Sequence, residues 1–175
     1  MLKALALVVT TLIVGLMTYA ATRPDSFRVE RAIIINASPE KIFPLIDDFH
    51  SWEEWSPWEK VDPAVQRYYS GAASGKGAVY AWRGNKELGQ GRMEIIETTP
   101  TDSLIIKIDF IEPFPAHNTI KFTLHSEGNS TTVTQAMYGP SPYISKLIGV
   151  FFSMDTMVGG KFEQGLTSLK AMAER

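Results

Sequence analysis

The stretch LIIKIDFIEPFPAHNTIKFTLHSEGNSTTVTQAMY, residues 104–138, decides the fold class. Within it, apolar residues alternate with more polar ones in three runs, marked by Leu104, Ile106, Ile108 and Phe110, then by Ile120, Phe122 and Leu124, and last by Val133 and Met137. A period of two is typical of a strand with one buried face. The turn at Gly128-Asn129 is short, so consecutive strands are expected to pair antiparallel.

Further strands are predicted on the N-terminal side of this stretch. Residues 27–35 alternate, with Phe27, Val29, Ile33 and Ile35 on one face. After two short helical stretches, strands are expected at residues 65–69, 78–82 and 87–97, the last entered through a turn at Gly84-Asn85.

The helical stretches lie between the first strand and the rest. Ser38-Pro39 resembles a helix start, with Ser38 as N-cap and Pro39 in the first helical position. We expect that helix to end near Asp47-Asp48. Residues 49–63 are rich in aromatic residues and proline, which indicates one short helix and a loop.

On the C-terminal side, Gly139-Pro140-Ser141-Pro142 ends the sheet and predicts a helix with Ser141 as N-cap. Beyond it, apolar residues recur mostly every three or four positions up to Leu169, which predicts one long helix with Phe151 and Phe162 on its inner side. Gly159-Gly160 has little helix propensity. The pair is expected to be either a hinge or a point of close backbone packing.

The N-terminal segment, residues 1–22, differs from the rest of the chain, residues 23–175. It has no charged residue from Ala4 to Thr22, and a helix of that length spans about 28 Å. We expect a single-pass membrane anchor through residues 4–22. A cleaved signal peptide, with Thr18-Tyr19-Ala20 as the cleavage site, is the alternative; a core helix is disfavoured because the run is apolar on all sides. Charges flank both ends, so the side of the membrane stays open.

The composition and length of residues 23–175 are those of one globular domain. Hydrophobic residues make up 45 % and charged residues 21 % of the chain, and the net charge is −2. No basic patch points to nucleic acid. The absence of cysteine excludes disulfides and thiolate metal sites. We expect a monomer.

Three stretches carry a resemblance to a known family: Phe27-Arg28-Val29-Glu30-Arg31, Ala37-Ser38-Pro39-Glu40-Lys41-Ile42-Phe43, and Trp52-Glu53-Glu54-Trp55-Ser56-Pro57-Trp58. They resemble the START/Bet v 1-like (SRPBCC) superfamily, and within it the bacterial polyketide cyclase/dehydrase-like branch. The resemblance covers residues 27–173. It implies an α+β helix-grip fold, in which a curved antiparallel sheet wraps a long C-terminal helix and leaves a cavity between them. It implies no shared catalytic motif.

Candidate ligand-binding residues follow from that cavity and are large and apolar. They are Trp55, Trp82, Met93, Phe110, Phe122, Met137, Phe151 and Met154. The repeat of Trp52, Trp55 and Trp58 suits either a packing cluster or one wall of a cavity mouth.

No catalytic, cofactor or metal site is predicted. His117 and His125 lie about 26 Å apart on one straight strand, so they cannot share an ion. The loop of residues 71–77 departs from the phosphate-binding pattern and is expected to be a glycine-rich turn. The acidic residues Asp47, Asp48, Glu53 and Glu54 are expected to be solvated, although a buried pair could perform acid/base chemistry.

Three functions therefore remain open. The first is a membrane-tethered binder or carrier of a small hydrophobic molecule. The second is a cyclase, dehydratase or hydrolase that acts on an apolar substrate in the same cavity, which a buried carboxylate with a raised pKa would favour. The third is an interaction module at the membrane with a filled core.

Overall fold

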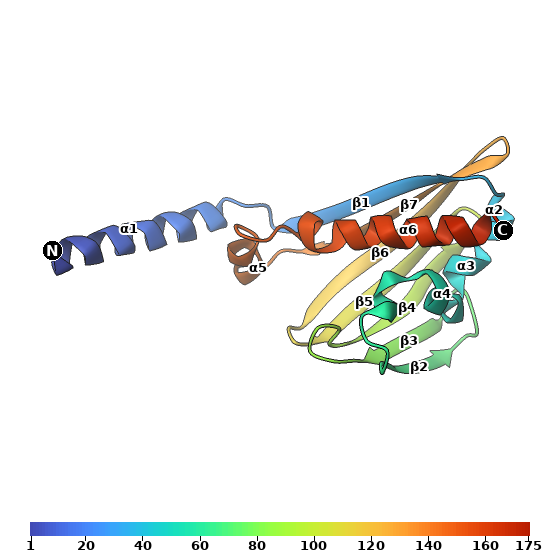
Figure 1. The fold of residues 1–175 in the computed structure, drawn as a ribbon, viewed down its shortest axis with the longest axis horizontal. Coiled ribbons are helices and arrows are strands. Elements are labelled where there is room, and N and C mark those ends of the chain that lie inside the picture. The colour runs from blue at the N-terminus through green and yellow to red at the C-terminus, as the bar shows by residue number, and fades with distance from the viewer.

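The computed structural model describes residues 1–175, and its main feature is one curved antiparallel sheet (Figure 1). Seven strands pair in the order β1-β7-β6-β5-β4-β3-β2. The strands are β1 (Ser26–Ile35), β2 (Gln66–Gly71), β3 (Ala78–Arg83), β4 (Gln90–Thr99), β5 (Ser103–Glu112), β6 (Ala116–Glu127) and β7 (Ser130–Pro140). The α+β fold with antiparallel neighbours is confirmed.

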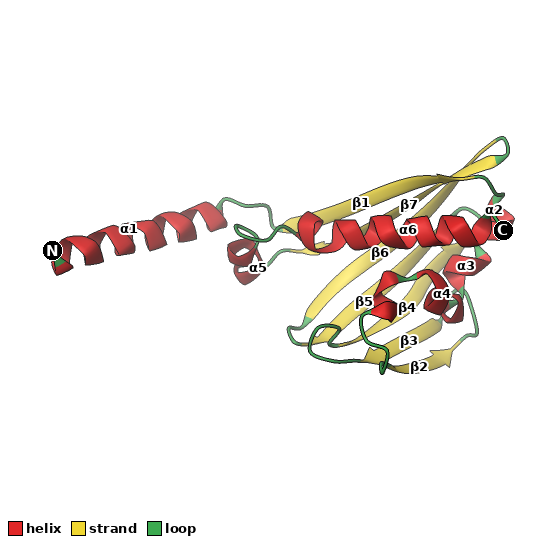
Figure 2. Cartoon of the chain, in the orientation of Figure 1, coloured by secondary structure: helices red, strands yellow, loops and turns green.

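The curvature of the sheet has a local cause in the pairing of β4 with β5. The register of this pairing shifts between Gln90 and Gly91 and again between Ile95 and Glu97. An extra residue in one strand bends it and increases its twist. The sheet therefore forms a concave face, and α6 lies across that face (Figure 2).

The helices differ greatly in length. They are α1 (Leu2–Ala21), α2 (Pro39–Ile42), α3 (Pro44–Asp47), η1 (Phe49–Ser51), α4 (Trp52–Trp55), η2 (Pro57–Lys60), α5 (Tyr143–Ile148), η3 (Asp155–Gly159) and α6 (Gly160–Ala173). In α6, Phe162, Leu166 and Leu169 share one buried face and join the core of the sheet. The predicted grip of the sheet on a C-terminal helix is confirmed.

The expected helix that begins at Pro39 is divided in the structure. Pro39 is in the first helical position, as predicted, and α2 ends at Ile42. Pro44 then begins α3, because a proline has no N–H to continue the hydrogen-bond ladder of the preceding turn. The segment from Phe49 to Lys60 contains three short helical turns instead of one helix and a loop.

The expectation of one continuous helix from residue 142 is wrong. The helix α5 is a separate element that ends at Ile148, and the long helix starts only at η3 and α6. Ser141 is not the N-cap; Pro142 is, without a side-chain hydrogen bond. The apolar residues of this segment recur as in a buried helix, but their side chains do not face the sheet. Phe151, for example, is 67 % exposed.

The glycine pair does not bend the backbone. Gly159 and Gly160 both have right-handed helical dihedral angles, and the π-helical turn η3 runs directly into α6. A Cβ on Gly159 would lie 2.2 Å from Nη2 of Arg31, whereas a Cβ on Gly160 would meet nothing within 4 Å. The expected close backbone packing is not found at either glycine; the neighbour of Gly159 is the end of the Arg31 side chain.

The N-terminal helix α1 extends away from the sheet (Figure 1). Of its residues only Ala20 is buried, so the core-helix alternative is wrong. Its mean hydropathy of 2.1 and its length fit either a membrane span or a signal sequence. Near its end it packs against α5, where the Tyr143 hydroxyl donates to the Met17 carbonyl at 3.0 Å.

Candidate functional site

A cavity of about 330 Å³ lies between the concave face of the sheet, the segment from α4 to η2, and the helices η3 and α6. Of its 25 lining residues, 16 are hydrophobic. Its size and apolar lining are those of small-molecule sites in proteins. The register shifts between β4 and β5 curve the sheet away from α6, which leaves this space open.

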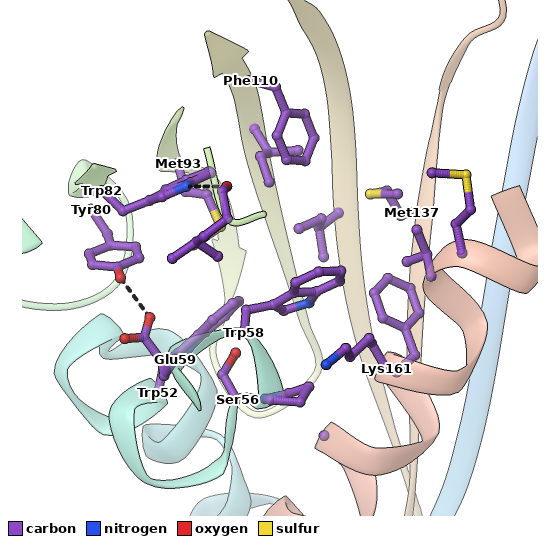
Figure 3. A pocket seen from close by; sticks show the side chains of 18 of the residues that line it. Trp52, Ser56, Trp58, Glu59, Tyr80, Trp82, Met93, Phe110, Met137 and Lys161 are labelled. Atoms are coloured by element: carbon purple, nitrogen blue, oxygen red, sulfur yellow. Dashed lines mark hydrogen bonds between the residues drawn. The ribbon is translucent and has the colours of Figure 1, made fainter. Parts of the chain in front are cut away.

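Aromatic side chains from β3 and β5, the two strands on either side of β4, form one wall (Figure 3). The rings of Tyr80 and Trp82 stack with centroids 6.0 Å apart, and Phe110 meets Trp82 edge-on at 6.0 Å. Trp82 lies over Gly91 of the neighbouring strand, where a Cβ would come within 2.3 Å of its ring. Gly91 therefore lets the indole lie flat against the sheet and leaves the cavity in front of it free.

Two tryptophans of α4 form the opposite wall. Their indole N–H groups donate to carbonyls of α3: Trp52 to Ile46 at 2.9 Å and Trp55 to Leu45 at 2.8 Å. Because their polar atoms are already satisfied, these rings contribute apolar surface to the cavity. Trp58, 38 % exposed, lines the mouth with the Lys161 ammonium 5.7 Å from its ring centre. The tryptophan repeat thus serves both as a packing cluster and as a cavity wall.

One carboxylate is buried beside the cavity. The Glu59 side chain is 7 % exposed; it pairs with Arg67 at 2.7 Å and accepts a hydrogen bond from the Tyr80 hydroxyl at 2.6 Å. Burial, followed by this hydrogen bond to Glu59, raises the pKa of Tyr80 well above its usual range. The Tyr80 phenol therefore keeps its proton, and the Glu59 carboxylate is held in place by Tyr80 and Arg67.

A few polar groups reach the apolar space. Gln135, 5 % exposed, faces inward from β7, and Ser56 follows α4; both line the cavity. Lys161 lies on the side of the mouth formed by α6 (Figure 3). These groups can form hydrogen bonds within an otherwise apolar space.

Comparison with known proteins agrees with this geometry. A family model described as "Polyketide cyclase / dehydrase and lipid transport" matches residues 26–174. The chain belongs to the polyketide cyclase/dehydrase and lipid transport family. No curated protein matches the chain closely enough to add to that assignment.

Solved structures share the family fold at low sequence identity. A protein of Chromobacterium violaceum is 14 % identical with a TM-score of 0.59, over 87 % of this chain and 99 % of its own. The Aha1 dimer from Colwellia psychrerythraea is 21 % identical with a TM-score of 0.58, over 85 % and 96 %. Ara h 8.0201 is 14 % identical with a TM-score of 0.55, over 85 % and 97 %. At such identities the likeness shows the Bet v 1-like fold alone.

Most of the residues predicted to bind a ligand line the cavity of this family member. They are Trp55, Trp82, Met93, Phe110, Met137 and Met154. Phe122 does not line it: the ring is fully buried behind the wall and meets Trp55 edge-on at 6.3 Å. Phe151 does not line the cavity, and the residue is 67 % exposed.

Several lining residues were not predicted, although the pattern contained signals for some of them. Tyr80 shares a strand face with Trp82, and Ile108 shares one with Phe110, so period-two alternation could have found both. Phe162 was predicted to be buried but not to line the cavity. Glu59 had no such signal, since its contacts are with residues of β2 and β3.

The remaining polar candidates lie apart from the cavity. The three histidines pair with their own neighbours: His50 with Asp48, His117 with Asp109, and His125 with Glu127. The structure contains no group of three side chains suited to hold a metal ion. Residues 71–77 form a turn between β2 and β3 with Gly71, Gly75 and Gly77 at positive φ, as expected for a glycine-rich turn.

The acidic cluster is divided among separate partners. Glu53 accepts from the Tyr69 hydroxyl at 2.9 Å, and Asp48 caps η1 through the His50 amide. Burial, followed by the nearby Asp48, raises the pKa of Asp47. Asp47 does not line the cavity, so the carboxyl group with a raised pKa lies away from the apolar site.

Proposed function

We propose that this chain binds or carries a small hydrophobic molecule in the cavity between the sheet and α6, and that α1 tethers it to a membrane as a monomer. The observation that carries the proposal is the apolar cavity of about 330 Å³. A well-packed core leaves few voids larger than a water molecule, so a space of this size argues against the alternative of a filled interaction module.

The same cavity favours binding over catalysis. Acid or base work on an apolar substrate needs a group that exchanges a proton at the substrate. Glu59, the one carboxylate buried in the wall, is held by Arg67 and Tyr80. The neighbouring polar groups, Ser56 and Gln135, are hydrogen-bonding groups that suit orientation of a ligand.

The composition and geometry of α1 support the tether. Thr11 and Thr18 donate to carbonyls one turn earlier in the helix, so their hydroxyls need no water. At the C-terminal end, Arg23 lies near the Tyr19 ring. Tyrosine is enriched at membrane–water interfaces. If the segment is instead a cleaved signal peptide, the mature chain will begin near residue 21, which N-terminal sequencing would reveal.

Titration of a dansyl-labelled fatty acid tests the binding proposal, with the full chain in mild detergent. Energy transfer from Trp52, Trp55 and Trp82 should excite a dansyl group held in the cavity and should saturate. Ile108→Phe fills part of the cavity and should weaken binding, whereas Ile105→Phe, on the other face of the same strand, should not. Equal affinities of the two variants, or no saturable signal, would reject the proposal.

A further inference from the structure

An unusual number of large apolar side chains are exposed at the end of the domain nearest α1. We call this set the apolar rim; its members are 47–75 % exposed and are Phe114, Ile144, Ile148, Phe151, Phe152 and Met157. Scattered single apolar residues on a surface are ordinary, whereas a group of them marks an interaction site. All but Phe114 belong to one stretch, from α5 to η3.

The topology of the sheet brings Phe114 to the same end. It lies in the β5–β6 connection, and because β6 and β7 are antiparallel, the start of β6 is beside the end of β7, where α5 begins. The β6–β7 turn at Gly128-Asn129 is at the opposite end of the sheet (Figure 1).

The rim is held close to α1 by both chain length and contact. Only residues 22–25 separate α1 from β1, and four extended residues reach at most about 14 Å. The hydroxyl of Tyr143, the first residue of α5, donates a hydrogen bond to the carbonyl of Met17, which is four residues before the end of α1. Four helical residues correspond to about 6 Å along α1. In a bilayer that α1 spans, the contact between Tyr143 and Met17 therefore lies within the interfacial layer.

The charged residues of α5 and η3 are paired within the protein. Lys146 pairs with Asp25, and Asp155 pairs with Arg31 at 2.8 Å. The Arg31 guanidinium lowers the pKa of Asp155, so that carboxyl stays ionised and paired. Residues 141–154 contain no acidic residue. This segment can therefore approach lipid with little uncompensated charge.

The rim also continues into the cavity. Phe114 and Met157 belong to both, and beside them Trp58 and Lys161 complete the mouth. A lysine at such an edge can keep its ammonium among head groups while its stem contacts apolar surface.

We propose that the apolar rim enters the surface of the bilayer that holds α1, so that the cavity mouth faces lipid and the ligand is a bilayer-resident amphiphile that passes between membrane and cavity without crossing water. The inference rests on the proposed tether. It adds a second membrane contact, made by the domain itself, and a route for the ligand.

Site-specific labelling tests the rim. Because the chain has no cysteine, a dye attaches only to the cysteine that is introduced. Phe152→Cys, Asn129→Cys and Val9→Cys each carry a nitrobenzoxadiazole dye, with the full chain in phosphatidylcholine nanodiscs that contain a doxyl-lipid quencher. We expect quenching at residue 9 in α1 and at residue 152 in the rim, and none at residue 129 in the distal turn.

The other outcomes separate the rim from the tether. Quenching at residue 9 without quenching at residue 152 would overturn the rim and leave the tether intact. If the dye at residue 152 were shielded from water but not quenched by lipid, a second copy of the chain would cover the rim, which also overturns the inference. Absence of quenching at both positions would reject tether and rim together.

Transfer kinetics test the route. A dansyl-labelled fatty acid supplied in the nanodisc bilayer should reach the cavity severalfold more slowly in Phe151→Ser/Phe152→Ser, while its affinity in mild detergent stays at the wild-type value. An unchanged transfer rate would overturn the route. If the wild-type chain did not bind the dansyl-labelled fatty acid in detergent, the cavity proposal itself would be rejected.

Discussion

Gly91 shows how a single residue shapes the cavity. The Trp82 ring occupies the place of its missing side chain, 2.3 Å from where a Cβ would lie. We expect Gly91→Ala to push the indole into the cavity, costing about 1–3 kcal/mol of stability as overpacking and lowering the affinity for a dansyl-labelled fatty acid. Urea unfolding and titration check both effects; Gly160→Ala, with open space around it, is the matched control. Unchanged affinity in Gly91→Ala would contradict this account of the wall.

Tyr80 should make stability depend on pH in the alkaline range. Burial, followed by the hydrogen bond to Glu59, raises the pKa of its phenol in the folded state. Above about pH 10 the unfolded chain ionises this tyrosine while the folded chain keeps the proton, so the free energy of unfolding should be insensitive to Tyr80 below about pH 10 and should fall above it.

Urea unfolding between about pH 8 and pH 11 measures that dependence. The fall should be shallower in Tyr80→Phe, because that variant has no phenol to ionise. The exposed Tyr68 supplies the control, and Tyr68→Phe should keep the wild-type slope. If Tyr80→Phe kept it as well, Tyr80 would have no part in the alkaline loss of stability.

At the scale of single residues, alternation predicted the inward position of Phe110 and Met137 because strand faces repeat every two residues. It could not predict Gly91 or Glu59. Their roles depend on residues across the sheet or in another element, and a strand pattern contains no information about its neighbours.

Among the helices, α6 stabilises the fold and the segment before it does not. Phe162 is 3 % exposed and packs in the core, so Phe162→Ala should cost about 3–5 kcal/mol. Phe151 lies outside the core, and Phe151→Ala should change stability by no more than about 0.5 kcal/mol. Unfolding in urea compares the two variants. Equal losses of stability in the two variants would contradict this division and favour the single long helix that the sequence pattern predicts.

The glycine pair offers a matched test inside one helix. Gly160→Ala should stabilise the protein by up to about 1 kcal/mol, because alanine has the higher helix propensity and open space surrounds it. Gly159→Ala should be less stable than Gly160→Ala, since its methyl would displace Arg31 from Asp155 and Glu163. Thermal unfolding measures the difference. A hinge would be supported only if both variants slowed ligand exchange without changing stability.

The order of elements was predictable for two reasons. The strands and the inner face of α6 each follow a short repeat of apolar residues, and the turns contain glycine followed by asparagine. The break between α5 and α6 was not. The apolar residues of the rim continue the three-to-four spacing of the helix, yet they face outward, and spacing alone cannot distinguish a buried stripe from one that faces lipid.

For the whole molecule, resemblance and pattern predicted the sheet that grips a helix, and the family match over residues 26–174 agrees with it. The identity of α1 as anchor or signal was not decided by the sequence, since both are apolar runs near an N-terminus. The position of the rim beside α1 arises only when residues far apart in the chain are assembled.

The central claim is that the cavity holds a small hydrophobic molecule. Native mass spectrometry of the full chain tests it most directly, after extraction in mild detergent and incubation with a lipid extract of the producing cells. We predict one small apolar molecule bound per wild-type chain and a clearly lower occupancy of Ile108→Trp, whose indole would take up part of the cavity. The bare chain mass for the wild type, or the same occupancy in Ile108→Trp as in the wild type, would contradict the account.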